Sequence, residues 1–272
     1  MQDYPNVRWR EHGPAPLRRA PVEATMTLSP ARSVALVTGG SRGIGAAISR
    51  RLAADGHAVA INYAGRCDDA EALAAELNAA GAQAIALQAD VADPQAVYQL
   101  FNAIEARFGG IDVAVNSAGV LQLAPLADTD DALFERVIGI NLKGAFNVLR
   151  ESARRVRDGG RIVTLSTSVV GTRLEDYSVY AASKSAVETM GAILSKELRG
   201  RNITVNAVAP GPTATDLFLD GKSPELIERL AKMNPLERLG TPEDIAGAVA
   251  FLVGADGGWI NGQVLRANGG MV

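Results

Sequence analysis

The sequence has little of several residue types that mark other classes of protein. Its 272 residues include one cysteine, Cys67, two histidines and only 5% aromatic residues. A single cysteine excludes an intrachain disulfide and fits a reducing cytosol, so we expect a cytoplasmic protein. His12 and His57 lie far apart in the sequence, and we predict no metal site.

Excess charge and long apolar runs are also missing. Lys and Arg number 27 against 30 Asp and Glu, a net charge of −3, and no basic run stands out. Nucleic acid and anionic membranes are therefore not expected as partners. No apolar stretch reaches the roughly 20 residues that a membrane span needs. The expected partner is a small molecule.

Ala, Val, Ile and Leu must build the core, because 47% of the chain is hydrophobic while aromatics are scarce. From Ser33 onward, short β-branched runs alternate with longer periodic stretches. Two of the stretches start with a cap residue and a proline, at Asp93-Pro94 and Thr241-Pro242. The predicted strands are 34–38, 58–62, 84–88, 113–116, 161–165, 203–208 and 263–266, and the predicted helices 43–55, 68–80, 94–107, 130–155, 179–199, 223–233 and 242–253.

This alternation predicts the fold class α/β: a single-domain Rossmann fold over 32–272, with a seven-stranded parallel sheet and helices on both faces. Residues 1–31 differ, because five prolines punctuate a segment without an apolar period. We predict a disordered N-terminal extension there. Met26 is an alternative start of the chain.

A glycine-rich turn follows the first predicted strand. Residues 38–45 read T-G-G-S-R-G-I-G and lead into a predicted helix. Glycine lets the chain turn tightly and lets phosphates approach the backbone, while the helix N-terminus offers free N–H groups and a partial positive charge. Between this strand and this helix, the pattern predicts a dinucleotide pyrophosphate site at Gly39, Ser41, Arg42, Gly43, Ile44 and Gly45.

The end of the second strand favours NADP(H) as the cofactor. An NAD site usually carries an acidic residue there to bind the ribose 2′-OH, but this strand continues as Asn62, Tyr63 and then Arg66 without a carboxylate. Arg42 and Arg66 suit a 2′-phosphate through charge-assisted hydrogen bonds. The alternative is that both arginines are ordinary solvated side chains.

Two further strand ends are expected to meet the cofactor. Asp90 and Val91 follow the third strand, where an Asp can accept a hydrogen bond from the adenine amino group. The fourth strand is followed by small residues that permit close approach to the ribose, and here the predicted contacts are Asn116, Ala118 and Gly119.

A tyrosine and a lysine four residues apart provide the predicted chemistry. Tyr180 and Lys184 share one face of a predicted helix. A free phenol has a pKa near 10, and a neighbouring ammonium is expected to lower it. Tyr180 would then donate a proton to a carbonyl undergoing reduction, while Lys184 hydrogen-bonds the nicotinamide ribose. Without the glycine loop, a packing tyrosine beside a surface lysine would be the commoner explanation.

A hydroxyl is expected to polarise the carbonyl. Ser166, Thr167 and Ser168 end the fifth strand and offer three candidates. Asn141 lies within a helical pattern, where asparagine is mildly unfavourable, which indicates a polar role.

Together these motifs resemble the short-chain dehydrogenase/reductase family from about Ser33 to Val272. The shared motifs are T-G-x-x-x-G-x-G, N-x-A-G, Y-x-x-x-K and a Pro-Gly turn, in family order. The resemblance implies a catalytic tetrad of Asn141, a hydroxyl after the fifth strand, Tyr180 and Lys184. It also implies that the Asn141 backbone holds a water in a proton relay to Lys184.

Two positions depart from the family pattern. Ser117 replaces the usual second asparagine of N-N-A-G. An ungapped alignment gives Thr167 as the polarising hydroxyl, whereas alignment on S-V-V-G gives Ser168, which we prefer at this stage.

The resemblance further implies that Pro210, Gly211, Thr213 and Thr215 lie near the nicotinamide and phosphates, and that 216–236 forms a substrate lid. It also implies a homotetramer, with a dimer as the alternative. The expected function is an NADPH-dependent reductase of a ketone, an aldehyde or a 3-oxoacyl thioester, similar to 3-oxoacyl-acyl-carrier-protein reductases and aldehyde reductases. The alternatives are an NAD-linked polyol or sugar dehydrogenase and a non-catalytic NADP(H)-binding sensor.

Overall fold

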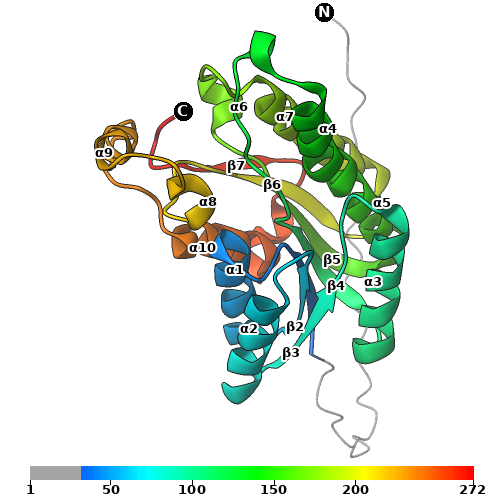
Figure 1. Ribbon diagram of the computed structural model, residues 1–272. Helices are drawn as coiled ribbons and strands as arrows, with labels where there is room; N and C mark the ends of the chain where they lie inside the picture. Colours follow the sequence, from blue (N-terminus) through cyan, green and yellow to red (C-terminus); the bar gives the residue numbers. More distant parts are fainter. Residues whose placement is uncertain (1–31) are drawn as a thin grey trace, which may run out of the picture. The chain divides into compact units, whose positions relative to one another are not determined.

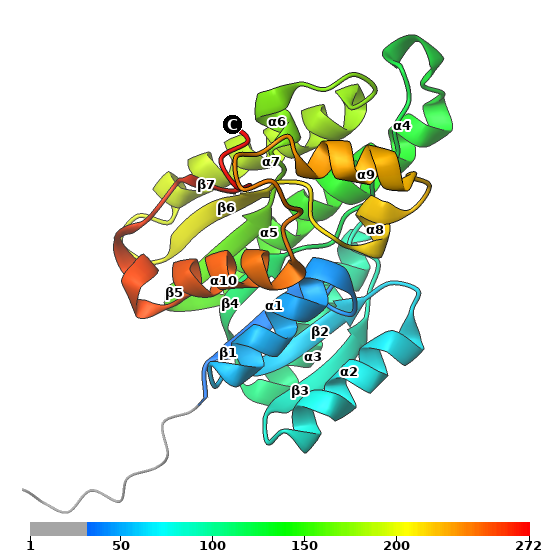
Figure 2. The ribbon, with the colours of Figure 1, turned by 90° about the vertical axis from the view of Figure 1, so that its left-hand side faces the viewer.

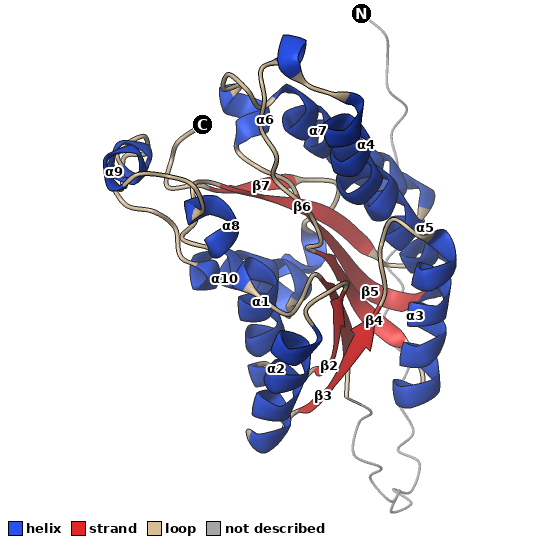
Figure 3. Cartoon of the chain, in the orientation of Figure 1, coloured by secondary structure: helices blue, strands red, loops and turns tan. Residues whose placement is uncertain are grey.

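The computed structural model describes residues 32–272 and shows one parallel sheet of seven strands (Figures 1 and 3). The predicted extension 1–31 lies outside the described residues. The sheet order is β3-β2-β1-β4-β5-β6-β7, and every pairing is parallel. This confirms the predicted fold class. The strands are β1 Val34–Thr38, β2 Ala58–Tyr63, β3 Gln83–Gln88, β4 Ile111–Asn116, β5 Val156–Leu165, β6 Thr204–Pro210 and β7 Val264–Ala267.

The strand order reverses between β1 and β4. The chain moves outward from β1 through β2 to β3, then returns to pair β4 on the other side of β1. In open α/β sheets, ligands bind at the carboxyl edge where the order reverses. Thr38 pairs with Asn116 in register, so β1 and β4 end side by side at this point.

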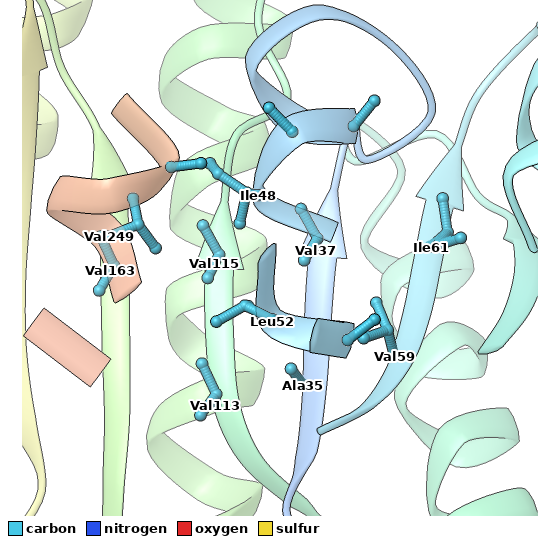
Figure 4. Close-up of a cluster of buried hydrophobic side chains, with 14 of the residues drawn as sticks. Ala35, Val37, Ile48, Leu52, Val59, Ile61, Val113, Val115, Val163 and Val249 are labelled. Carbon is cyan, nitrogen blue, oxygen red and sulfur yellow. The ribbon is translucent and has the colours of Figure 1, made fainter. Parts of the chain in front are cut away.

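Helices cover both faces of the sheet because side chains alternate along each buried strand. Ala35 and Val37 face α1 (Gly43–Ala54), α2 (Cys67–Ala79) and α10 (Pro242–Val253), which lie in front of the strands in Figure 2. Figure 4 shows this core, with Ile48 and Leu52 of α1 packed on the strand valines. Val34 and Leu36 face α3 (Pro94–Phe108), α5 (Ala145–Arg155) and α7 (Ser178–Glu197).

Both predicted capped helix starts are confirmed. The Asp93 carboxylate accepts a hydrogen bond from the Gln95 N–H, with Pro94 at the first helical position of α3. Thr241 and Asp244 form a reciprocal capping box at the start of α10. These caps satisfy N–H groups that have no partner within the helix.

The region 130–155 is not a uniform α-helix. It divides into α4 (Asp131–Val137), a π-helical segment η2 (Ile138–Gly144) and α5. A π-helical turn inserts an extra residue without changing the apolar period by much, so the sequence pattern did not reveal it. Such insertions are frequent at functional sites.

Other differences are small. β5 begins at Val156, five residues before the predicted start, because Gly159 and Gly160 interrupt its β-branched pattern. Four short helices were not predicted, because a single turn shows no period: η1 Leu126–Asp128, α6 Val169–Thr172, α8 Asp216–Leu219 and η3 Ala255–Trp259. The predicted helix 223–233 is shorter, as α9 Pro224–Ala231. Within 32–272, no helix is both long and apolar enough to span a membrane.

Candidate active site

The glycine-rich turn between β1 and α1 is packed so closely that side chains do not fit. A Cβ on Gly45 would overlap the carbonyl oxygen of Gly39, and one on Gly39 would lie 2.8 Å from the Ala118 Cα. Gly39 and Gly43 have φ of 59° and 51°, a left-handed conformation that glycine adopts without strain. The Ser49 hydroxyl donates hydrogen bonds to the carbonyls of Gly40 and Gly45 and fixes the turn on α1.

The turn presents backbone to the cavity above it. Helix α1 starts at Gly43 without a side-chain cap among the described residues, so its first N–H groups face the ligand space. The segment between Gly39 and Gly45 therefore offers donors and the positive end of a helix dipole to an anion. This backbone segment, Gly39 to Gly45, is called the glycine cradle, and its N–H groups fit a pyrophosphate. It needs glycine at 39 and 45, because a side chain at either position would disrupt its shape.

At the end of β2, the predicted residues divide into a structural group and a ligand-facing group. The Asn62 amide donates to the carbonyls of Leu87 and Ala89, so it ties β2 to β3. Arg42 and Arg66 are exposed and line the same cavity, and Arg66 also pairs with Asp69 at 3.4 Å. Asp69 therefore competes with a bound phosphate for the Arg66 side chain, and the sequence analysis did not predict this ion pair. Tyr63 is buried, and its hydroxyl lies 3.2 Å from the Cys67 sulfur.

The ends of β3 and β4 are fixed by polar contacts. Asp90 is exposed at the cavity and accepts a hydrogen bond from the Ala92 N–H. The Thr38 hydroxyl donates to Asn116 Oδ1 at 2.9 Å and accepts from the Ala118 N–H at 3.2 Å. Asn116 therefore holds the ends of β1 and β4 together rather than facing the ligand space.

A cavity of about 450 Å³ joins these segments to the predicted catalytic residues. It runs along the carboxyl ends of the strands, and nearly all of the predicted site residues line it. Asn116 and Asn141 are buried behind the lining. The predicted residues in the lining are Gly39, Ser41, Arg42, Gly43, Ile44, Gly45, Asn62, Tyr63, Arg66, Asp90, Val91, Ala118, Gly119, Thr167, Ser168, Tyr180, Lys184, Pro210, Gly211, Thr213 and Thr215.

Lys184 lies buried at the centre of the site. Its ammonium donates to the Leu165 carbonyl at 2.8 Å, where β5 ends. A Cβ on Gly119 would lie 3.4 Å from this nitrogen and 3.3 Å from Asn141 Oδ1. Because Gly119 has no side chain, the Lys184 ammonium and the Asn141 side chain can both pack against its backbone. Burial lowers the pKa of Lys184 to about 8.

The π-helical segment η2 places Asn141 against the loop after β4. Its amide donates to the Val120 carbonyl at 2.9 Å and accepts from the Val120 N–H at 2.8 Å. A weaker bond of 3.4 Å reaches the Ser183 hydroxyl on α7. Both ends of the Asn141 side chain are thus committed to holding the loop and the helix together.

The phenol of Tyr180 is more basic than the sequence predicted. Burial raises its pKa to about 12, the Thr167 hydroxyl opposes this, and Tyr177 adds to it. The expectation that Lys184 lowers this pKa is wrong, since the pKa is raised. The reason is that the ammonium lies 6.0 Å from the ring centroid and is bonded to Leu165. Tyr180 is therefore protonated at neutral pH.

Thr167 and Ser168 have different surroundings. The Thr167 hydroxyl accepts a hydrogen bond from the Val169 N–H at 3.3 Å and opposes the rise in the Tyr180 pKa. The Ser168 hydroxyl donates to the Ala209 carbonyl at 3.3 Å and accepts from the Asn268 amide at 2.9 Å. Ser168 thus anchors the C-terminal segment.

The turn after β6 closes the same edge of the sheet. The Gly211 N–H bonds the Ala267 carbonyl of β7, and a Cβ on Gly211 would lie 2.9 Å from the Asn268 Cα. Thr213 is buried and donates to the Gly211 carbonyl, while Thr215 caps α8 and lies beside Gly43. The turn after β6 therefore packs against the glycine-rich turn through Thr215 and against the C-terminal segment through Gly211.

Sequence reasoning placed a lid at 216–236 but did not assign the C-terminal segment or the other apolar lining residues to the cavity. Asn268 has no sequence signal, because its contact to Ser168 spans 100 residues. Tyr177 stands one helical turn before Tyr180 and was detectable by that spacing. The apolar lining residues that were not predicted as ligand contacts include Leu121, Leu174, Tyr177, Leu217, Phe218, Leu230 and Met271.

A glycine cradle at a strand-order reversal, with half-buried Tyr180 and buried Lys184 in the same cavity, defines a Rossmann-type dinucleotide-dependent oxidoreductase. The comparisons with known proteins narrow the class. The family model described as enoyl-(acyl carrier protein) reductase matches residues 39–272. The chain belongs to the short-chain dehydrogenase/reductase family.

Similar proteins cover nearly the whole described part. A short-chain type dehydrogenase/reductase of Picea abies is 47% identical over 88% of this chain and 92% of its own. The NADPH-dependent aldehyde reductase-like protein, chloroplastic, of Arabidopsis thaliana is 44% identical over 88% and 94%. A crystal structure of a short chain dehydrogenase from Burkholderia cenocepacia in complex with NADP is 40% identical, covers 88% and 97%, and has a TM-score of 0.83.

Gly45→Ala is expected to abolish dinucleotide binding, because its methyl group would displace the Gly39 carbonyl and open the cradle. Calorimetric titration with NADPH measures this. Gly247→Ala is the matched control: a Cβ there meets nothing within 4 Å, and binding should not change. Unchanged NADPH affinity in Gly45→Ala would contradict the assignment of the cradle.

The burial of Lys184 predicts a pH dependence of stability. Below about pH 8 both the folded and unfolded chains carry the charge, and burying it costs about 3 kcal/mol, because the pKa falls from 10.5 to about 8. Between these values the folded chain loses the proton first, so the cost disappears as pH rises.

We therefore compare urea unfolding of the cofactor-free protein with that of Lys184→Met. The free energy of unfolding of the wild type should rise relative to the variant by about 3 kcal/mol as pH goes from 8 to 10.5. Parallel pH profiles would show that the ammonium is not desolvated.

Proposed function

We propose that this protein is an NADPH-dependent carbonyl reductase that converts a ketone or an aldehyde to an alcohol. The observation that carries the proposal is the placement of the Tyr180 phenol, the Lys184 ammonium and the Thr167 hydroxyl at one end of a cavity whose other end is the glycine cradle. A 3-oxoacyl thioester belongs to the same reaction class.

The cofactor is NADP(H). The cradle at 39–45 suits the pyrophosphate, and Arg42 with Arg66 supplies two cations to a 2′-phosphate where an NAD site would carry a carboxylate. Similar proteins carry names that include NADPH-dependent aldehyde reductase, and three similar structures hold NADP or NADPH. When bound, the reduced nicotinamide supplies a hydride to the carbonyl carbon.

The chain itself binds and protonates the carbonyl oxygen. Tyr180 transfers its phenolic proton to this oxygen as negative charge develops on it. Thr167 donates a hydrogen bond to the same oxygen. Lys184 would hold the nicotinamide ribose by a hydrogen bond and would return a proton to Tyr180. Because the Asn141 side chain is committed to Val120, its part in the relay falls to its backbone, which holds a water.

The polarising hydroxyl is assigned to Thr167 rather than Ser168. The Ser168 hydroxyl already has a donor and an acceptor partner, Asn268 and Ala209, and freeing it would release the C-terminal segment. Thr167 lines the cavity with Tyr180 and opposes the rise in the Tyr180 pKa, which supports a place for its hydroxyl beside the carbonyl oxygen.

The character of the cavity favours a carbonyl reductase over a polyol or sugar dehydrogenase. A polyol needs several paired hydrogen-bonding groups, because an unpaired buried hydroxyl is costly. The cavity lining instead includes many apolar side chains, among them leucines, aromatic rings and Met271. The sensor alternative is disfavoured because Tyr180 and Lys184 are both present and line the same cavity.

Three further parts of the proposal rest on the family. Residues 216–236, which include α8 and α9, act as the substrate lid and carry Leu217, Phe218 and Leu230 into the cavity. The protein forms a homotetramer through the helices 131–155 and α7 and through β7. The single cysteine, Cys67, supports a cytoplasmic location, although two similar proteins are described as chloroplastic.

The first test measures NADPH oxidation with a panel of an acetoacetyl thioester, short aldehydes, diketones and a quinone. Tyr180→Phe should lower kcat/KM at least about 100-fold, because it removes the general acid, while NADPH affinity stays unchanged. Thr167→Ala should cost about 100-fold, and Thr167→Ser should restore most activity.

Ser168→Ala is the matched control. It should lower the melting temperature, because Ser168 anchors the C-terminal segment, and should leave kcat nearly unchanged. A loss of kcat confined to Ser168→Ala would reverse the assignment of the hydroxyl. Tight NADPH binding without turnover of any carbonyl would favour the sensor alternative.

A second test addresses the choice of cofactor. Arg42→Ala and Arg66→Ala should each raise the KM for NADPH by about 10-fold or more, the value of one charge-assisted hydrogen bond, and leave the KM for NADH within about 3-fold. Arg51→Ala is the control, because Arg51 pairs with Asp55 and does not line the cavity. Equal effects on NADPH and NADH would rule out a 2′-phosphate site at these arginines.

A further inference from the structure

The two ends of the cavity differ in chemistry. The end formed by β1, β2 and β3 carries Arg42, Arg66 and Asp90. The end formed by the segments after β5, β6 and β7 is rich in apolar side chains and also carries exposed Asp216, and of the charged residues in the whole lining only Lys184 is buried. The apolar side chains include Leu174, Tyr177, Leu217, Phe218, Leu230 and Met271.

Among the apolar lining residues, Tyr177 is the closest to Tyr180 in the sequence. Its ring centroid lies 6.2 Å from that of Tyr180, and the ring planes meet at 68° in an edge-to-face arrangement. The ring is half-buried in the cavity lining. Both rings line the cavity, so the Tyr177 ring lies next to the side chain proposed to hold the carbonyl oxygen.

The backbone before Tyr177 is held in a conformation that non-glycine residues rarely adopt. Arg173 and Asp176 have φ of 52° and 68°, and they are two of only four non-glycine residues with positive φ in 32–272. The Asp176 carbonyl accepts a hydrogen bond from the Ala124 N–H, which ties this segment to the loop after β4. Strained backbone persists where the surrounding structure fixes it and clusters at ligand sites. Here it sets the start of α7, with the Tyr177 carbonyl accepting the Ala181 N–H at 2.7 Å.

We propose that Tyr177 is a specificity-determining residue and that the substrate is a carbonyl compound with an aromatic ring attached to the carbonyl carbon. The substrate ring packs on Tyr177, and Phe218 with Met271 supplies further aromatic and sulfur contacts within the same wall. The proposal rests on the proposed function. The carbonyl carbon gains a hydride, the oxygen gains the Tyr180 proton, and NADPH is oxidised to NADP⁺.

The test uses two ketones of equal carbon count, acetophenone and cyclohexyl methyl ketone, which differ in whether the ring is aromatic. The ratio of kcat/KM for the aryl to the alkyl ketone should fall about 3- to 10-fold in Tyr177→Leu, the value of one aromatic pair. Because each variant is compared with itself on two substrates, a general loss of folding or of NADPH binding does not change the ratio.

Tyr177→Phe should keep the wild-type ratio, since it keeps the ring. Tyr98→Leu, on α3 and outside the cavity lining, is the matched control and should also keep it. An equal loss on both ketones in Tyr177→Leu, or a wild type that prefers the alkyl ketone, would overturn the assignment while the Tyr180 mechanism stands. A wild type that reduces no carbonyl at all would instead refute the proposed function.

Discussion

The buried ammonium of Lys184 is the interaction on which the rest of the site depends. A cation held away from water is unfavourable unless polar groups surround it. The Leu165 carbonyl receives it because β5 ends at that residue, and Gly119 leaves room for Asn141 beside it. Because the ammonium loses hydration, its pKa falls to about 8, which brings it into the range where a lysine can exchange protons.

The helix that carries Asn141 shows how the fold adapts to this need. In a regular α-helix from 131 to 155, the side chain at 141 would have a different rotation about the axis. The π-helical segment Ile138–Gly144 adds a residue to the turn, and the Asn141 amide then bonds both backbone groups of Val120. One irregular turn thereby connects the loop after β4 to α7 and fixes the surroundings of Lys184.

The order of strands separates the two functions of the cavity. β1, β2 and β3 are neighbours on one side of the reversal, so the arginines that follow β1 and β2 gather at the nucleotide end. β5, β6 and β7 lie on the other side, and the segments after them bring Thr167, Pro210 and Met271 to the reacting end. The gathering of arginines at one end and of apolar side chains at the other follows from topology rather than from any one motif. Figure 1 shows α8 and α9 next to the carboxyl ends of β6 and β7. Leu217 and Phe218 of α8 and Leu230 of α9 line the cavity.

The sequence by itself determined the strands, the sheet class, the glycine cradle and the Tyr180-Lys184 pair, because each depends on a local period or a short spacing. It named Asn141 from its unfavourable place in a helix but did not reveal the π-helical turn. Only the tertiary structure decided that Asn116 bonds Thr38 rather than facing the cavity, and that the Asn268 amide donates a hydrogen bond to the Ser168 hydroxyl. The same is true of the burial that raises the pKa of Tyr180. These outcomes depend on contacts between residues 78 or 100 positions apart and on exclusion of water, and neither leaves a pattern along the chain.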